Sequence, residues 1–171
     1  ISAFDSNAAI VHYKPLLSKS LPSKNRNILL IDSGAHYLEG TTDVTRVIRI
    51  GTSNISKIKY FYTHLLKSLI KLENNIFPSG TRSSEIDLFI RNYLSKFNIF
   101  YSHGTGHGVG NFGDVHERYP IISSTSKDTF TNNNLFSIEP GHYVEGHFGL
   151  RIENLYVTKI TNKSLKLKNI T

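Results

Sequence analysis

Short apolar runs bounded by Asn, Pro and Lys open the chain and predict strands. Two of them are NAAIVHY, residues 7–13, and NILLIDSG, residues 27–34, with a proline-bearing and lysine-bearing loop between them. The next segment, TTDVTRVIRIG over 41–51, alternates β-branched and polar residues, which is typical of another strand. A reversal at HYLEG, residues 36–40, predicts that this strand pairs antiparallel with the preceding one.

Apolar residues then recur at helical spacing in two segments. The first predicted helix runs from 53 or 54 to about 75, and the second runs from 83 or 84 to about 97. In the second helix, Asp87 follows Ser84 by one helical turn and is a candidate capping box. The predicted buried faces are Ile55, Ile58, Phe61, Leu65, Leu66 and Leu69 in the first helix, and Ile86, Phe89, Ile90, Tyr93, Leu94 and Phe97 in the second.

The last third of the chain returns to strand patterns. Residues 123–134 have the composition of a surface loop, and the segments 135–143 and 148–160 read as two strands of a final hairpin or ribbon. Strands, two helices and strands again, in that order, predict an α+β domain with a curved, mostly antiparallel sheet.

Composition narrows the classes of protein. The 171 residues are 39% hydrophobic and 19% charged, which indicates one globular domain. Cysteine is absent, so disulfides and thiolate metal sites are excluded. The net charge of +7 would suit a nucleic-acid partner if it were clustered, but only NKSLKLKN, residues 162–169, concentrates lysine. We therefore expect no nucleic-acid partner, and because no apolar run is long enough to span a bilayer, no membrane partner either.

The stretch HGTGHGVG, residues 103–110, sets His103 and His107 among four glycines. Alternating glycines argue against a helix. They suit either a bend with incidental histidines or a strand that brings its backbone close to a ligand. The stretch alone leaves both interpretations open.

Four carboxylates stand in otherwise apolar strands: Asp32, Asp43, Glu139 and Glu153. Taken singly, each has an ordinary structural explanation, since a strand-end Asp caps turns and a strand Glu faces water. If they converge, their mutual repulsion must be offset. Two divalent cations and one imidazole would do so, and oxygen-rich ligation favours Mn²⁺ first, with Co²⁺, Zn²⁺ or Fe²⁺ as alternatives.

The segments LLIDSGAHYLEGTTDVTR, HGTGHGVG, DVHE, IEPGHY and GLRIEN, in this order and spacing, resemble the metal-binding domain of the aminopeptidase P enzymes, the Xaa-Pro aminopeptidases of the pita-bread metallopeptidase family. The resemblance runs from about residue 1 to 157. VHERYP stands where the family usually has VHEGP, and Ser137 and Ile138 stand where a small polar or acidic pair is common. Neither departure touches a metal ligand of the family.

The resemblance implies a set of metal ligands and a set of substrate residues. Asp32 would chelate one metal, Asp43 and Glu153 would bridge the pair, and His107 with Glu139 would bind the second metal. The implied catalytic residues are His116, Glu139 and His103, and the implied substrate-binding residues are His12, His103, His116 and Arg151, of which Arg151 would also orient Glu153. The remaining histidines, His36, His64, His142 and His147, match no functional position.

The activity implied is removal of the N-terminal residue from peptides with proline in the second position, by attack of a hydroxide that bridges two divalent metals. Prolidase, which takes only Xaa-Pro dipeptides, is the nearest alternative, and methionine aminopeptidase fits the motifs less well. A non-catalytic pita-bread binding module is the alternative from another class, but such modules lose ligands that this chain keeps.

The same resemblance implies an incomplete chain. We expect residues 1–171 to be one catalytic domain without its first helices and N-terminal domains, with 158–171 as a C-terminal extension. A missing segment of the same protein would then cover a sheet face that carries Ile10, Leu29 and Ile31. A homodimer and a cytoplasmic location are further expectations.

Overall fold

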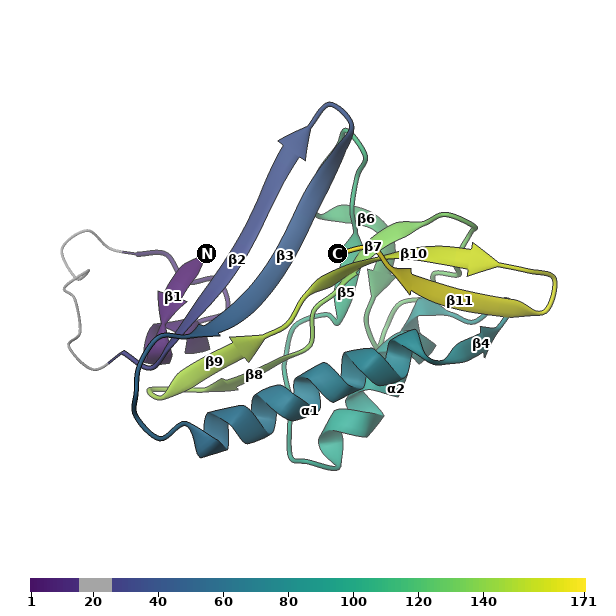
Figure 1. The fold of residues 1–171 in the computed structure, drawn as a ribbon. Helices are drawn as coiled ribbons and strands as arrows, with labels where there is room; N and C mark the ends of the chain where they lie inside the picture. The colour runs from purple at the N-terminus through teal and green to yellow at the C-terminus, as the bar shows by residue number, and fades with distance from the viewer. Residues whose placement is uncertain (16–25) are drawn as a thin grey trace.

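The computed structural model describes residues 1–15 and 26–171, so the second proline of the first predicted loop lies outside the described residues. A three-stranded antiparallel sheet, in the order β1-β2-β3, contains β1 (Ser2–Phe4), β2 (Ile28–Tyr37) and β3 (Gly40–Arg49). The predicted hairpin around 36–40 is confirmed, and Figure 1 shows it as a ribbon that rises away from the helices. Its register pairs Asp32 with Thr45 and Gly34 with Asp43.

The predicted strand over 7–13 is wrong. The chain forms the short β1 instead and then a 3-10 helix, η1 (Asp5–Ala9). The cause is Asp5, whose carboxylate accepts the backbone N–H groups of Asn27 at 3.1 Å and Ile28 at 3.0 Å. These hydrogen bonds to the start of β2 turn the chain before a longer strand can form. The 3-10 helix η1 then packs against β9 (Phe148–Arg151).

Both predicted helices are present with shorter ends, α1 (Ser56–Glu73) and α2 (Ser83–Ser95). Leu65 and Leu69 of α1 are buried as expected, but Leu66 is exposed. The predicted capping box from Ser84 to Asp87 is also wrong. The backbone N–H of Arg82 donates to the side chain of Glu85 at 2.7 Å, and Asp87 is buried instead.

A six-stranded antiparallel sheet holds most of the core, in the order β4-β11-β10-β7-β5-β6. Helices α1 and α2 run beneath the strands in Figure 1, with α1 against β11 and β9 and α2 against β6. The large buried side chains Phe136 and Tyr156 lie in this core. The bounds of its strands are β4 (Ile76–Pro78), β5 (Gly106–Gly108), β6 (Glu117–Ile122), β7 (Leu135–Ile138), β10 (Asn154–Ile160) and β11 (Ser164–Asn169).

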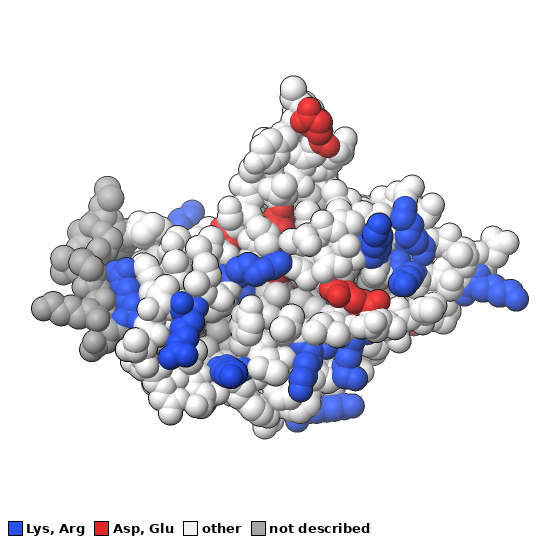
Figure 2. Space-filling model, in the orientation of Figure 1, with Lys and Arg blue, Asp and Glu red and all other residues white. Residues whose placement is uncertain are grey.

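Strand β11 shows that the predicted C-terminal extension is an integral part of this sheet. Leu165 and Leu167 are buried in the core, while Lys166 and Lys168 between and after them are exposed. The lysine-rich segment is therefore a half-solvated strand, whose alternation follows the strand period of two. Figure 2 shows Lys and Arg spread over this face of the molecule instead of gathered in one stripe.

The two predicted strands of the final ribbon are each broken once. Residues 135–143 form β7 and then β8 (Gly141–Val144), with Glu139 and Pro140 between them. Residues 148–160 form β9 and β10, with Ile152 and Glu153 between them. Because β8 pairs with β9 while β7 pairs with β10, both breaks fall where the ribbon leaves the six-stranded sheet. Two carboxylates are thereby placed at the junction between sheets. The α+β class is confirmed.

Candidate metal centre

The five predicted ligands converge from five separate segments of the chain. Asp32 and Gly34 share a face of β2 because side chains alternate, and Gly34 pairs with Asp43. Glu153 reaches the same place because it forms an isolated antiparallel bridge with Thr45 on β3. The remaining two predicted ligands, from β5 and the end of β7, are His107 and Glu139.

His107 lies at the centre of the cluster. Its Nε2 is 3.5 Å from Oδ2 of Asp43, 3.5 Å from Oε1 of Glu139 and 3.9 Å from Oε1 of Glu153. Its Nδ1 lies 3.0 Å from the carbonyl oxygen of Gly108, which can only accept, so Nδ1 carries the hydrogen. Burial lowers the pKa of His107. The ring is therefore neutral and turns the lone pair of Nε2 toward the carboxylates.

The side chains of the five predicted ligands form two triads that share Glu153. Ligand atoms of Asp32, Asp43 and Glu153 lie within 4.8 Å of one another, and so do those of His107, Glu139 and Glu153. A third triad contains Asp43, His107 and His116. The sharing of Glu153 is the arrangement that a bridging carboxylate between two metals requires.

The pKa values of the carboxylates show that the cluster lacks positive charge. Burial first, and repulsion from Asp32 second, raise the pKa of Asp43 to about 6. Burial and repulsion from Asp43 raise the pKa of Glu153 to about 8. Burial and repulsion from Glu153 raise the pKa of Glu139 well above its ordinary value. Four carboxylates and one neutral imidazole form a donor set of the kind that hard or borderline divalent cations bind.

Among the described residues, Arg151 is the cation whose side chain contacts the carboxylates of the cluster. Its Nη2 donates to Oδ2 of Asp32 at 2.7 Å, and its Nε lies 3.8 Å from Oε2 of Glu139. Nε also donates to the hydroxyl of Thr45 at 3.3 Å, and Thr45 donates to Oε2 of Glu153 at 2.8 Å. Hydrogen bonds thus connect Arg151 to Glu153 through Thr45, a residue that the sequence pattern did not reveal.

A second relay leads from Arg151 to His103. Nη1 of Arg151 donates to the hydroxyl of Tyr143 at 3.0 Å, and that hydroxyl lies 2.9 Å from Nε2 of His103. Nδ1 of His103 lies 2.7 Å from the carbonyl oxygen of Gly104, so it carries the hydrogen and Nε2 accepts from Tyr143. Burial lowers the pKa of His103 to about 4, which keeps it neutral. Both ring nitrogens of His103 are therefore already engaged.

The cluster opens into a cavity of about 590 Å³. His12, His103 and His116, the three predicted substrate histidines, all line this cavity. The ring of His116 stands edge-on to that of His107, with 4.4 Å between their centroids, and its side chain is exposed to the cavity. Val115 and Ile121 add apolar wall.

His36 also lines this cavity, although the sequence interpretation gave it no functional position. It shares the face of β2 that carries Asp32 and Gly34, and its Nδ1 lies 2.9 Å from the hydroxyl of Thr41 on β3. The alternation of β2 could have revealed this placement. The other three histidines lie elsewhere: His64 stacks on Phe97, His142 packs against Phe61, and His147 is exposed.

Residues 106–108 of the glycine-rich stretch form the strand β5, whose backbone lies very close to that of its neighbours, and this decides between the two interpretations left open by the sequence. A Cβ atom on Gly106 would lie 1.9 Å from the carbonyl oxygen of Ser137 on β7. That close approach of β5 to β7 sets His107 next to Glu139.

The fold and this cluster of carboxylates agree with the comparison to known families. Residues 1–159 match the model of metallopeptidase family M24, and the chain belongs to this family. Over 163 residues it is 45% identical to a probable Xaa-Pro aminopeptidase P of Podospora anserina and 43% identical to one of Verticillium alfalfae. Each alignment covers 93% of this chain, but only 24% and 26% of those relatives, so the chain spans about a quarter of their length.

Solved structures share the pita-bread fold of the family. The X-prolyl aminopeptidase of Caenorhabditis elegans, described as a cytosolic enzyme with a di-nuclear active site, superimposes with a TM-score of 0.90 at 37% identity. That match covers 100% of this chain and 29% of the other. A prolidase of Thermococcus sibiricus gives a TM-score of 0.80 at 30% identity, covering 98% of this chain and 43% of the other.

Proposed function

We propose that this chain is the catalytic core of a dinuclear aminopeptidase that removes the N-terminal residue from peptides with proline in the second position. The observation that supports this most is the convergence of four carboxylates and the neutral ring of His107 on two triads that share Glu153. The higher identity to relatives named as Xaa-Pro aminopeptidases P favours this activity over the prolidase alternative. The chain retains all five predicted metal ligands, which argues against a non-catalytic binding module.

The cofactors are two divalent ions. Asp32, Asp43 and Glu153 would hold one ion, and His107, Glu139 and Glu153 would hold the other, with Asp43 and Glu153 shared between the two. Oxygen donors with a single nitrogen suit Mn²⁺, while Zn²⁺ or Co²⁺ are possible substitutes. When bound, such a pair supplies an activated water and polarises the scissile carbonyl.

The residues of this chain bind the substrate and move its proton. His116 stands beside the cluster with an exposed ring, and we assign it the hydrogen bond to the developing oxyanion. His103 keeps no free N–H, so it contributes shape to the pocket wall together with His12. Glu139 lines the cavity beside His107, and burial raises its pKa, so we assign it the transfer of a proton to the leaving proline nitrogen.

The substrates are therefore peptides, and the enzyme acts in the cytoplasm, as the Caenorhabditis elegans relative is described to do. No helix among the described residues is long and apolar enough to cross a bilayer. Ile10 follows η1 and lies outside the sheet, so only Leu29 and Ile31 of the expected apolar face belong to a strand. A segment that covers this face, and a homodimer, remain predictions of the sequence.

Three peptides separate the alternatives. The metal-loaded protein is incubated with Xaa-Pro-Yaa, Xaa-Ala-Yaa and the dipeptide Xaa-Pro, while its metal content is measured by mass spectrometry. An Xaa-Pro aminopeptidase cleaves the first fastest. Preference for the dipeptide would indicate prolidase, and equal cleavage of the alanine peptide would refute proline selectivity.

A further inference from the structure

Helix α2 carries a buried carboxylate that belongs to neither the metal cluster nor the cavity. Asp87 is 1% exposed, and a buried carboxylate is costly unless it is fully paired. Nε of Arg91, one turn later, donates to both of its oxygens at 2.9 Å. The hydroxyl of Thr105 donates to Oδ1 of Asp87 as well. Tyr101 must then be the donor in its 2.6 Å hydrogen bond with the hydroxyl of Thr105.

The other two nitrogens of Arg91 donate hydrogen bonds to the backbone of the segment that carries His103. Nη1 donates to the carbonyl oxygen of Tyr101 at 2.8 Å, and Nη2 donates to that of His103 at 2.7 Å. The guanidinium carbon also lies 4.1 Å from the ring centroid of Tyr101. A planar guanidinium can fix two carbonyls and a carboxylate at once, which a lysine cannot.

The segment 101–105, which Arg91 and Asp87 bind, contacts the metal cluster through Thr105. The carbonyl oxygen of Thr105 accepts the backbone N–H of Glu139 at 2.8 Å, and the N–H of Thr105 donates to Ile122 at 2.7 Å. The ring of Tyr101 lies 4.9 Å from that of His103. One rigid connection therefore runs from α2 to a substrate histidine and to a metal ligand.

We propose that Asp87 and Arg91 are positioning residues of the active site, which fix His103 and the backbone of Glu139 through the segment 101–105. This inference rests on the proposed aminopeptidase function. Neither side chain touches the cavity, so both act through Thr105 and the carbonyl of His103. From the sequence alone, Asp87 is a candidate for a helix cap and Arg91 has no predicted role.

The test compares variants in the full metal-loaded chain. Arg91→Lys keeps the charge opposite Asp87 but loses the paired carbonyl contacts. Thr105→Val keeps the shape of the side chain but loses its hydroxyl, and Thr105→Ser restores the hydroxyl. Ile90→Val, a small change at a buried position of the same helix, is the control for loss of packing alone.

We expect Arg91→Lys and Thr105→Val to lower kcat/KM for Xaa-Pro-Yaa by about 10- to 100-fold, since a displacement of roughly 1 Å has effects of this size. Thr105→Ser and Ile90→Val should stay near wild type. In the metal-free protein, hydrogen exchange should accelerate over 99–106 and 135–142 in the first two variants only. If both variants match Ile90→Val in turnover and in exchange, the proposal is wrong. A wild-type protein without Xaa-Pro cleavage would overturn the proposed function, while the exchange comparison would still show whether Asp87 and Arg91 fix the segment 101–105.

Discussion

Arg151 donates from Nη2 to Oδ2 of Asp32 at 2.7 Å, although 119 positions separate the two residues in the chain. The arginine side chain is 3% exposed. This ion pair places a buried cation inside a cluster of four carboxylates. The single positive charge of Arg151 does not offset four carboxylates. The excess negative charge therefore makes the stability of the metal-free protein depend on pH.

The stability of the metal-free protein should therefore fall as the pH rises. Burial and mutual repulsion raise the pKa of Asp43 to about 6 and that of Glu153 to about 8 in the folded state. A raised pKa means that the folded form binds protons more tightly than the unfolded form. The stability from these groups is complete below their ordinary pKa values and is lost as the pH passes about 6 to 8.

Thermal melts of the chelated protein should show a Tm several degrees higher at about pH 5 than at about pH 8. Adding Mn²⁺ at the higher pH should restore it, because the ions replace the missing positive charge. Glu153→Gln should make the Tm of the chelated protein less dependent on pH. A Tm that rises steadily over this range in chelator would contradict the charge balance described above.

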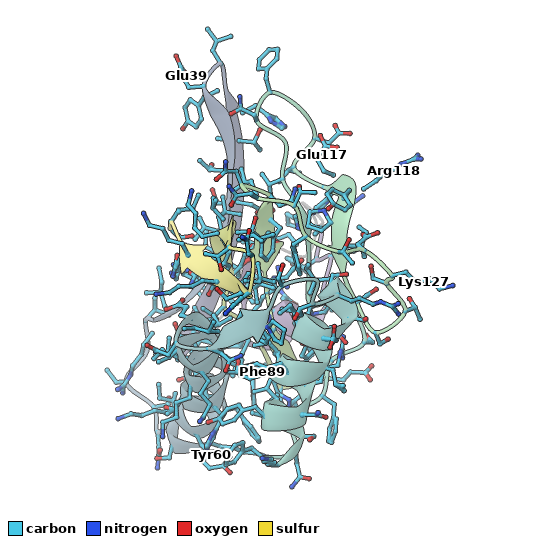
Figure 3. The ribbon with its side chains drawn as sticks, turned by 90° about the vertical axis from the view of Figure 1, so that its right-hand side faces the viewer. Glu39, Tyr60, Phe89, Glu117, Arg118 and Lys127 are labelled. Carbon is cyan, nitrogen blue, oxygen red and sulfur yellow. The ribbon has the colours of Figure 1, made fainter. Side chains whose placement is uncertain are left out.

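Glu153→Gln should weaken metal binding at both sites by at least about tenfold, since both triads share this carboxylate. Calorimetric titration with Mn²⁺ measures the change. Glu39→Gln is the matched control, because Glu39 is exposed at the tip of the β2–β3 hairpin (Figure 3) and neither lines the cavity nor belongs to any of the triads. Equal binding by both variants would remove Glu153 from the metal site.

His116→Ala should reduce turnover by about 10²-fold or more while the protein keeps two metals. The reason is that His116 lines the cavity, where we propose that it donates a hydrogen bond to the substrate. Its ring also lies close enough to Asp43 and His107 to ligate a metal. Metal analysis beside the kinetics distinguishes the two roles, because loss of metal in parallel with activity would make His116 a ligand.

Gly106→Ala should destabilise the protein and loosen its metal site. The new Cβ atom would meet the carbonyl oxygen of Ser137 at 1.9 Å, so β5 must move away from β7 and take His107 with it. Gly104→Ala is the control, since its Cβ would lie 3.4 Å from the nearest carbonyl oxygen, that of Ile122. Thermal melts and metal titration of both variants check this, and similar losses in the two would show that crowding at Gly106 is not the cause.

Cleavage of Xaa-Pro-Yaa should occur in two phases when enzyme is in excess. A prolyl bond has no N–H, and an extended pocket accepts the trans isomer. The cis fraction, about 10–30% in free peptides, must isomerise over tens to hundreds of seconds before it is cut. Stopped-flow measurement with and without a prolyl isomerase tests this, and a slow phase that the isomerase leaves unchanged would point to another step.

The local patterns of the sequence were enough for the elements whose partners are near in the chain. Helical spacing predicted α1 and α2, and the alternation around 36–40 predicted the β2–β3 hairpin, because both kinds of element satisfy their backbone within a short segment. The sequence also predicts that Asp32, Asp43, Glu139 and Glu153 would need cations if they converged, but their convergence itself was visible only in the structure. The roles of individual ligands came from the family resemblance.

Contacts between distant segments decided the rest. Asp5 ends β1 early because its partners lie at the start of β2, and the ribbon breaks at Pro140 and Glu153 because β8 and β9 leave the larger sheet. Asp87 looks like a cap in sequence, yet it is buried because Thr105 and Arg91 pair with it. The sequence determines which chemical groups each residue carries. Only the packing of remote strands and helices determines which of these groups come into contact.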